Sequence, residues 1–157
     1  MSAPSAPIEV TAPKPPGQGP GSAAAISAIA QLPQIRQTLN AVVGLRLAIV
    51  FGSCAKGQAK PDSDLDIALA FDQAMSVQQH IALIEALALA TGRPIDLIDL
   101  RTVGEPLLGQ IMQHGVRILG SDVLHAQYMT RHVMDAAEFM PYQARILQER
   151  RQAWMHK

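Results

Sequence analysis

The chain has 157 residues, which is enough for one domain with a substantial hydrophobic core. Lys plus Arg and Asp plus Glu number 13 each, so the sequence lacks the positive charge that extended nucleic-acid binding needs, although one nucleotide requires only a local site. Its one cysteine excludes an intramolecular disulfide and a zinc cluster built from cysteines. The N-terminus lacks a secretory signal and no apolar run approaches the ~20 residues of a membrane span, so we expect a cytoplasmic protein without membrane contact.

Residues 1–22 differ in composition from the rest of the chain. Six prolines stand there among Ser, Ala and Gly, and prolines remove backbone donors and block helix formation. This composition predicts a disordered tail, with a proline-rich recognition segment as the alternative. Apolar residues at helical spacing follow from Ala23 to Val43. We expect Pro33 to divide this stretch into two helices and Gly44 to close the second.

Beyond Gly44, apolar runs and helix caps predict alternating strands and helices. Strands are expected over residues 45–51, 65–70, 95–100 and, as a short fourth, 116–119. Helices are expected over residues 76–90, 105–113, 122–140 and 141–156, with Pro141 beginning the last one. The predicted fold class is therefore α+β: a small mixed β-sheet flanked by helices over residues 23–120, followed by C-terminal helices over residues 121–157. Those last helices carry apolar residues that either pack on the core or bind a partner.

Two carboxylates stand at the start of the second predicted strand. Asp64 and Asp66 are two residues apart, and on a strand such residues project from the same face. Carboxylates placed together repel each other unless a cation neutralises them, and oxygen-only ligands suit Mg²⁺. Asp62, Ser63 and Asp64 form a second Asp-x-Asp sequence, and we interpret Asp62 and Ser63 as residues of a polar turn.

A glycine turn follows the first predicted strand. Gly52 has no side chain, so the backbone N–H groups of the turn can approach a triphosphate closely. The Ser53 hydroxyl adds a donor, and Lys56 adds a positive charge. Cys54 lies in the same turn and is interpreted as a small filler residue, with a redox-sensitive thiol as the rarer alternative. Gly52, Ser53 and Lys56 are the predicted nucleotide-binding residues.

A third carboxylate is expected on a neighbouring strand. Asp96 and Asp99 are both present in the third predicted strand, but they are three residues apart and face opposite sides of a regular strand. Only one of them can join Asp64 and Asp66. Asp96 lies earlier in the strand and is preferred, with Asp99 held in reserve.

The Gly-Ser pair, the ten residues that follow it and the Asp-x-Asp sequence resemble the nucleotidyltransferase superfamily of the DNA polymerase beta kind. The small size is most similar to the minimal nucleotidyltransferases, which often act as antitoxins paired with a HEPN toxin. The resemblance implies a nucleotidyltransferase fold and an enzyme that uses ATP and Mg²⁺, with two ions, to move AMP onto a tyrosine hydroxyl of a partner HEPN ribonuclease toxin.

The same resemblance assigns roles to individual residues. Gly52 and Ser53 match the family's triphosphate-binding pair, and Asp64 and Asp66 match its metal ligands. Asp96 matches the third carboxylate, which in larger members helps to deprotonate the acceptor. Many minimal members have Arg where this chain has Lys56, so bidentate phosphate contact is lost there. Two alternatives stay open: an antitoxin that neutralises its partner by binding alone, and a nucleotidyltransferase for small molecules or RNA.

Overall fold

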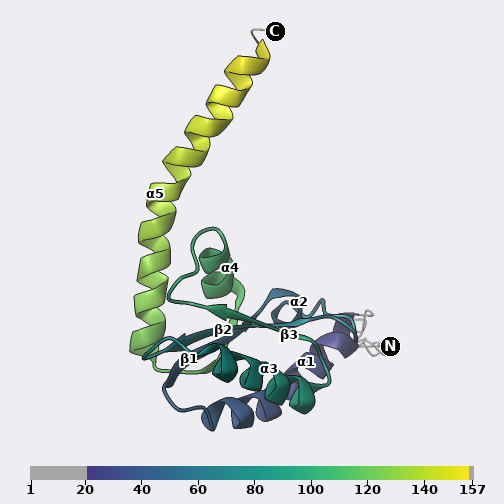
Figure 1. Cartoon of the computed structure of the whole chain (residues 1–157). Helices are drawn as coiled ribbons and strands as arrows, with labels where there is room; N and C mark the ends of the chain where they lie inside the picture. Colours follow the sequence, from purple (N-terminus) through teal and green to yellow (C-terminus); the bar gives the residue numbers. More distant parts are fainter. Residues whose placement is uncertain (1–20, 156–157) are drawn as a thin grey trace, which may run out of the picture.

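The fold is known from a computed structural model that describes the backbone of residues 21–155 and the side chains from Gln31 onward (Figure 1). The predicted disordered tail therefore lies outside the described residues, except that the first helix already begins at Gly21. The helices are α1 (Gly21–Asn40), α2 (Gly52–Ala55), α3 (Val77–Thr91), α4 (Leu107–His114) and α5 (Asp122–Met155). The strands are β1 (Leu45–Phe51), β2 (Leu65–Phe71), β3 (Ile95–Asp99) and β4 (Val116–Leu119).

The four strands form one sheet in the order β3-β2-β1-β4. β1 pairs antiparallel with β2 and with β4, whereas β2 pairs parallel with β3. The predicted mixed sheet is confirmed, and each predicted strand is present within two residues of its expected ends. The parallel pair brings the starts of β2 and β3 together, and the antiparallel pair brings the end of β1 to the same place.

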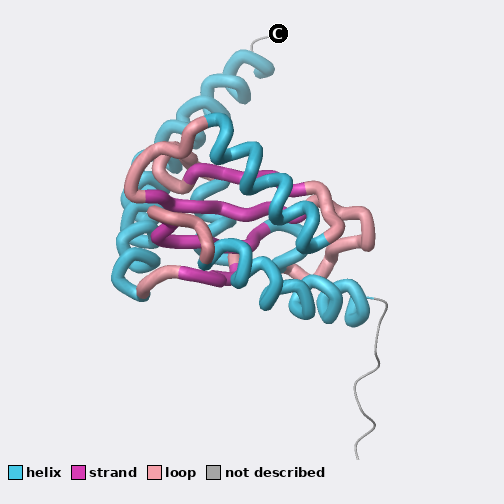
Figure 2. Tube along the Cα trace, turned by 60° about the horizontal axis from the view of Figure 1, so that its bottom comes forward, coloured by secondary structure: helices cyan, strands magenta, loops and turns pink. Residues whose placement is uncertain are grey.

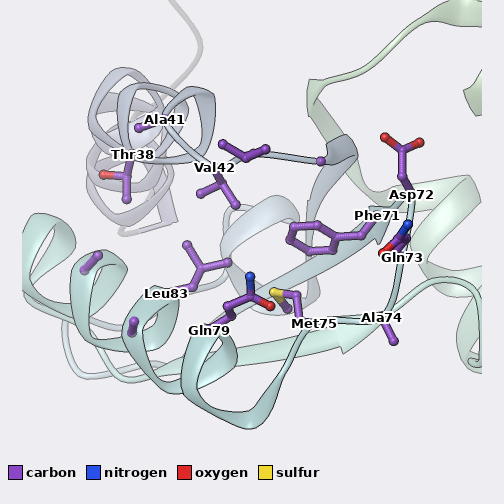
Figure 3. Close-up of a pocket in the computed structure, with 14 residues that line it drawn as sticks. Thr38, Ala41, Val42, Phe71, Asp72, Gln73, Ala74, Met75, Gln79 and Leu83 are labelled. Atoms are coloured by element: carbon purple, nitrogen blue, oxygen red, sulfur yellow. The ribbon is translucent and has the colours of Figure 1, made fainter.

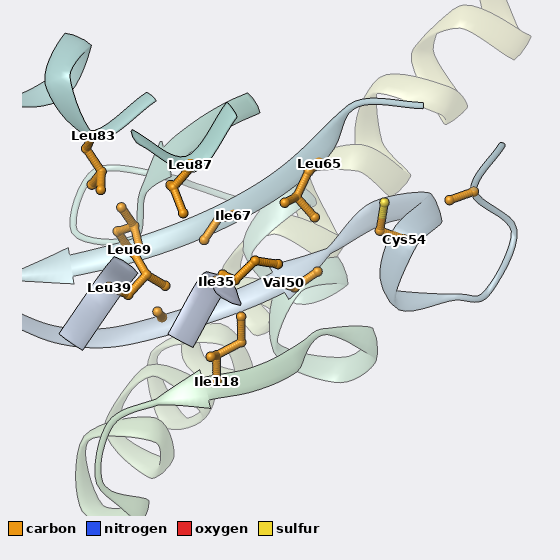
Figure 4. Packing of buried hydrophobic residues seen from close by; sticks show 12 residues of the cluster. Ile35, Leu39, Val50, Cys54, Leu65, Ile67, Leu69, Leu83, Leu87 and Ile118 are labelled. Atoms are coloured by element: carbon orange, nitrogen blue, oxygen red, sulfur yellow. The ribbon is translucent and has the colours of Figure 1, made fainter. Parts of the chain in front are cut away.

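Helices cover both faces of the sheet (Figures 1 and 2). α1 and α3 cover one face, where buried side chains of the helices pack on alternate residues of the strands (Figure 4). The main contributors to this core are Ile35, Leu39, Val50, Ile67, Leu69, Leu83 and Leu87. α4 and the first half of α5 cover the other face, over Leu47, Ile49, Ala68 and Leu100. No described helix combines the length and the apolar character that crossing a bilayer would require.

Two predicted helix breaks are wrong. Pro33 lies inside α1, which is one helix, and Pro141 lies inside α5, which continues without interruption to Met155. At Pro33 the helix is held on both sides of the proline, because Leu32 and Ile35 pack on the same core. Pro141 and Ala137, whose carbonyl would have accepted the missing hydrogen bond, are both exposed, so water can replace that bond.

The other helix ends predicted from the sequence lie close to the observed ones. Ser76 caps α3 with a reciprocal capping box to Gln79, and Gly92 ends the helix in a left-handed conformation. α4 begins two residues later than predicted, since Pro106 is its N-cap residue rather than part of its first turn. α1 ends at Asn40, and Gly44 lies beyond it in the turn before β1.

Candidate active site

Gly52 and Asp66 bring together the two halves of the sequence motif, the Gly-Ser pair and the Asp-x-Asp sequence. Phe51 pairs with Asp66 across the antiparallel strands, so the first residue after β1 lies against this carboxylate. Gly52 has φ 71°, and a Cβ there would overlap the Asp66 carboxylate, with its Cγ only 3.2 Å away. Any other residue at position 52 would be strained and would displace Asp66.

Asp96 lies directly beside Asp66. The two residues are register partners in the parallel ladder of β2 and β3, so their side chains project on the same face. That face is the one covered by α4 and α5, because Leu65 and Ile67 point into the core under α1 and α3. Asp64 comes one residue before β2 rather than within it, and it is exposed. Asp66 and Asp96 thus lie side by side, and Asp64 precedes β2 at the same end of the sheet.

The electrostatics of Asp66 follow from this crowding. Partial burial raises the pKa of Asp66 first, and the negative charges of Asp96 and Asp64 raise this pKa further. Among residues 31–155 no hydrogen bond or ion pair engages the three carboxylates. The site thus concentrates negative charge that the described side chains do not neutralise.

This arrangement fits Mg²⁺ that arrives with a nucleotide. Within the described range, no three His, Cys, Asp or Glu side chains are grouped as a complete metal site. Mg²⁺ is usually held by one or two carboxylates together with waters and substrate phosphates, so it does not need a cage made only of protein ligands. The Asp66 carboxylate lies against the glycine turn and Asp64 is two residues before it, and both supply the oxygen ligands that such an ion prefers.

The predicted nucleotide-binding residues form the short helix α2 and its end. Ser53 is half-buried, whereas Lys56 is the exposed C-cap residue. No side chain caps the N-terminus of α2. Cys54 is buried in the core, its thiol donates to the carbonyl of Asp64 at 3.5 Å, and burial raises its pKa (Figure 4). These features support the filler interpretation of Cys54, which also joins the turn to the start of the acidic strand.

Asp99 is separated from the other carboxylates. It lies at the opposite end of β3 and on the face of Leu97 and Leu69. Its carboxylate accepts hydrogen bonds from the Arg101 backbone and guanidinium, which lower its pKa. Asp96 is therefore the residue of this strand that accompanies Asp66.

Arg93 is a residue that the sequence reasoning missed. Only 5% of it is exposed, and its guanidinium donates to the carbonyls of Lys60 and Ser63 and to the side chain of Gln31. It thereby fixes the loop that ends at Asp64. The one signal in the sequence is a lone charged residue between Gly92 and Pro94, immediately before the acidic strand.

An apolar pocket lies elsewhere in the described part of the chain. It has a volume of about 800 Å³ and is bounded by the end of α1, the end of β2 and the start of α3 (Figure 3). Val42, Phe71, Met75 and Leu83 line it with apolar surface. Its carboxylate, Asp72, forms an exposed ion pair with Arg46. Because Phe71 ends β2 and Asp66 is near its start, this cavity is remote from the acidic site.

Comparison with known proteins relates this site to a family. Residues 33–123 match the model of "Polymerase beta, Nucleotidyltransferase". The chain is 38% identical over 63 residues to "Protein adenylyltransferase MntA" of Thermococcus cleftensis, a match that covers 40% of this chain and 64% of that protein. It is 31% identical over 77 residues to the protein of the same name from Shewanella oneidensis, covering 49% of this chain and 55% of that protein. The chain thus matches less than two thirds of the length of either relative.

Solved structures share the fold. A chain of the crystal structure of a toxin–antitoxin pair with AMP-PNP superposes with a TM-score of 0.67 at 23% identity, over 75% of this chain and 96% of that one. A chain from the structure of the tri-AMPylated Shewanella oneidensis HEPN toxin in complex with MNT antitoxin superposes with a TM-score of 0.64 at 20% identity. This match covers 78% of this chain and 97% of that one. The family match spans β1 to β4 and includes every residue of the acidic site. The chain belongs to the polymerase beta family of nucleotidyltransferases.

Proposed function

We propose that this protein is an Mg²⁺-dependent adenylyltransferase that moves AMP from ATP to a tyrosine hydroxyl of a HEPN-type toxin and so acts as its antitoxin. The observation that carries the proposal is the contact between the Gly52 turn and Asp66, with Asp96 beside it on the same face. Two curated relatives are named protein adenylyltransferases, and one similar structure contains an AMPylated HEPN toxin with its antitoxin.

In the proposed reaction, the groups of the site divide the tasks. The backbone of Gly52 and the hydroxyl of Ser53 hold the triphosphate, and Lys56 adds a positive charge near it. Asp64 and Asp66 would hold Mg²⁺, and Asp96 would be the third ligand if two ions bind. When bound, Mg²⁺ neutralises the charge that develops on the phosphate oxygens.

Asp96 also has a proton-accepting task. The acceptor hydroxyl oxygen forms a bond to the α-phosphorus, the bond from this phosphorus to pyrophosphate breaks, and the hydroxyl proton passes to a carboxylate oxygen of Asp96. The products are the adenylylated hydroxyl and pyrophosphate. Asp96 is exposed, so an acceptor from a second protein can reach it.

The test is transfer of labelled AMP to a co-expressed HEPN partner. Asp64→Asn keeps the shape of the side chain but removes its charge, and we expect transfer to fall at least about 10²-fold. Asp62→Asn is the matched control, because Asp62 lies in the same loop, is also exposed and takes no part in the site. Equal transfer by the wild type and Asp64→Asn would contradict the proposal.

A further inference from the structure

The C-terminal half of α5 projects away from the domain (Figure 1). With 34 residues, α5 is about 51 Å long at the usual rise per residue. Its contacts with the core come from its first part, through Leu124, Tyr128, Met129 and the buried His132. Beyond these residues the helix extends away from the sheet (Figures 1 and 2). An unsupported helical segment with an interior proline has little stability in water, so the projecting part needs a surface to pack on.

One face of this helix carries a heptad pattern. Four large apolar side chains recur there every seven residues: Val133, Met140, Leu147 and Trp154. Their exposed fractions are, in that order, 60%, 66%, 65% and 86%. Ala137 and Ala144, also exposed, each lie four residues after a large member and three before the next. We call these six residues the α5 seam. Alternating spacings of four and three are typical of a helix that packs against another helix in a coiled coil.

The α5 seam is complementary to itself. In an antiparallel pair of copies, Leu147 of one helix lies against Ala137 of the other, and Met140 lies against Ala144. Each large side chain then meets a small one, which allows the two helices to approach and interdigitate. Arg151 falls at the next position of the pattern, opposite Val133, where its long stem can cover apolar surface while the charge stays in water.

The charges along α5 favour the same orientation. Residues 133–138 contain the carboxylates of Asp135 and Glu138 and no Lys or Arg, and Asp135 forms an ion pair with Arg131 one turn earlier. Residues 145–151 contain three arginines and one glutamate. An antiparallel second copy brings the acidic segment of one helix beside the basic segment of the other, whereas a parallel copy would place the arginines together.

We propose that the α5 seam is a homodimerisation surface on which a second copy of this chain packs antiparallel. The seam begins ten residues after the end of the family match at residue 123, so the shared domain does not account for it. The proposal does not depend on the transferase activity, because the seam contains no residue of the acidic site.

The first measurement is the mass of the purified full chain by light scattering at micromolar concentrations and above. We expect twice the 16.8 kDa of one chain. Leu147→Glu places a charge in the middle of the seam and should weaken dimerisation at least about 100-fold. Leu89→Glu on α3 is the matched control, since Leu89 is 90% exposed and lies off the seam. Circular dichroism checks that both variants remain folded.

Trp154 gives a second readout, because it is the only tryptophan of the sequence. In the dimer its emission should shift to shorter wavelength, and dilution or Leu147→Glu should reverse the shift. A wild-type chain that stays monomeric would overturn the proposal, as would a dimer that Leu147→Glu leaves intact. A monomer whose seam is instead covered by a different helical protein, with binding lost in Leu147→Glu, would also overturn it.

Discussion

At the scale of single residues, the surroundings of Asp66 disfavour the charged form of its carboxylate. It is partly buried, the charges of two other carboxylates act on it, and Gly52 is packed against it. A carboxylate in such a place is destabilised in its charged form unless a cation is present. The same surroundings that raise its pKa therefore prepare it to hold a cation brought by a nucleotide.

Gly52→Ala should damage the site more than the fold. The new Cβ overlaps the Asp66 carboxylate, so we expect AMP transfer to fall about 10²-fold, since small displacements of reacting groups have effects of that size. Gly44→Ala is the control: Gly44 also has a left-handed φ of 79°, but a Cβ there meets nothing within 4 Å. Both variants should lose about 1–2 kcal/mol of unfolding free energy, and only Gly52→Ala should lose activity. Equal activities would show that the close approach to Asp66 is irrelevant.

Asp96 and Asp99 should differ sharply when each is changed to Asn. Asp96→Asn removes the proposed proton acceptor beside Asp66, and initial rates of AMP transfer should fall about 10²-fold or more. Asp99→Asn removes a carboxylate that Arg101 already engages at the other end of β3, so the transfer rate should stay near that of the wild type. The reverse order of rates would place the third carboxylate at Asp99.

Arg93 should matter for both stability and activity. Arg93→Ala leaves the carbonyls of Lys60 and Ser63 without their donor, and we expect a loss of about 2–4 kcal/mol in urea unfolding. Because those carbonyls belong to the loop that ends at Asp64, AMP transfer by the folded variant should fall as well. Arg36 is exposed, and Arg36→Ala should change stability by less than about 0.5 kcal/mol. An Arg93→Ala protein with full stability would refute this anchoring role.

At the scale of elements, α5 is fixed to the domain by a few strong polar contacts. The Arg131 guanidinium donates to the carbonyls of Leu100, Arg101 and Val103, in the loop that follows β3. The next residue, His132, contacts Glu105 at 2.7 Å, and both side chains are almost completely buried. The loop after β3 and the start of α5 therefore hold each other in place.

Arg131→Ala should destabilise the fold by about 2–3 kcal/mol in urea unfolding, because three carbonyls lose a charged donor. Arg46→Ala is the comparison, since Arg46 forms an ion pair with Asp72 in which both side chains are more than half exposed. Such a pair contributes about 0–1 kcal/mol. Similar losses in the two variants would mean that the Arg131 contacts do not anchor α5.

Most elements could be predicted from local patterns, and the two failures have a physical cause. The buried strands and the Ser76 cap have signals within a few residues, so their positions follow from the sequence. A proline breaks a helix only where the lost hydrogen bond cannot be replaced. Whether Leu32 and Ile35 pack on one core, or whether Ala137 faces water, depends on the tertiary structure and has no local signal.

At the scale of the whole molecule, different parts of the chain serve different contacts. The acidic site lies at the end of the sheet where β1 finishes and β2 and β3 begin. The α5 seam extends from the first half of α5 into the part of that helix that leaves the domain (Figure 1). Asp66 and Asp96 could be predicted as candidates because each lies near the start of an apolar strand, although their register pairing has no local signal. Arg93 could not, since its partners lie about 30 and 60 residues away in the chain.

The most direct test of the acidic site needs no acceptor. Binding of AMP-PNP, measured by calorimetry with and without Mg²⁺, reports whether these carboxylates hold an ion together with a nucleotide. We expect Mg²⁺ to strengthen binding to the wild type and to Asp62→Asn at least about 10-fold, and to have no effect on the Asp64→Asn, Asp66→Asn double variant. A double variant that responds to Mg²⁺ as strongly as the wild type would contradict the assignment of this site.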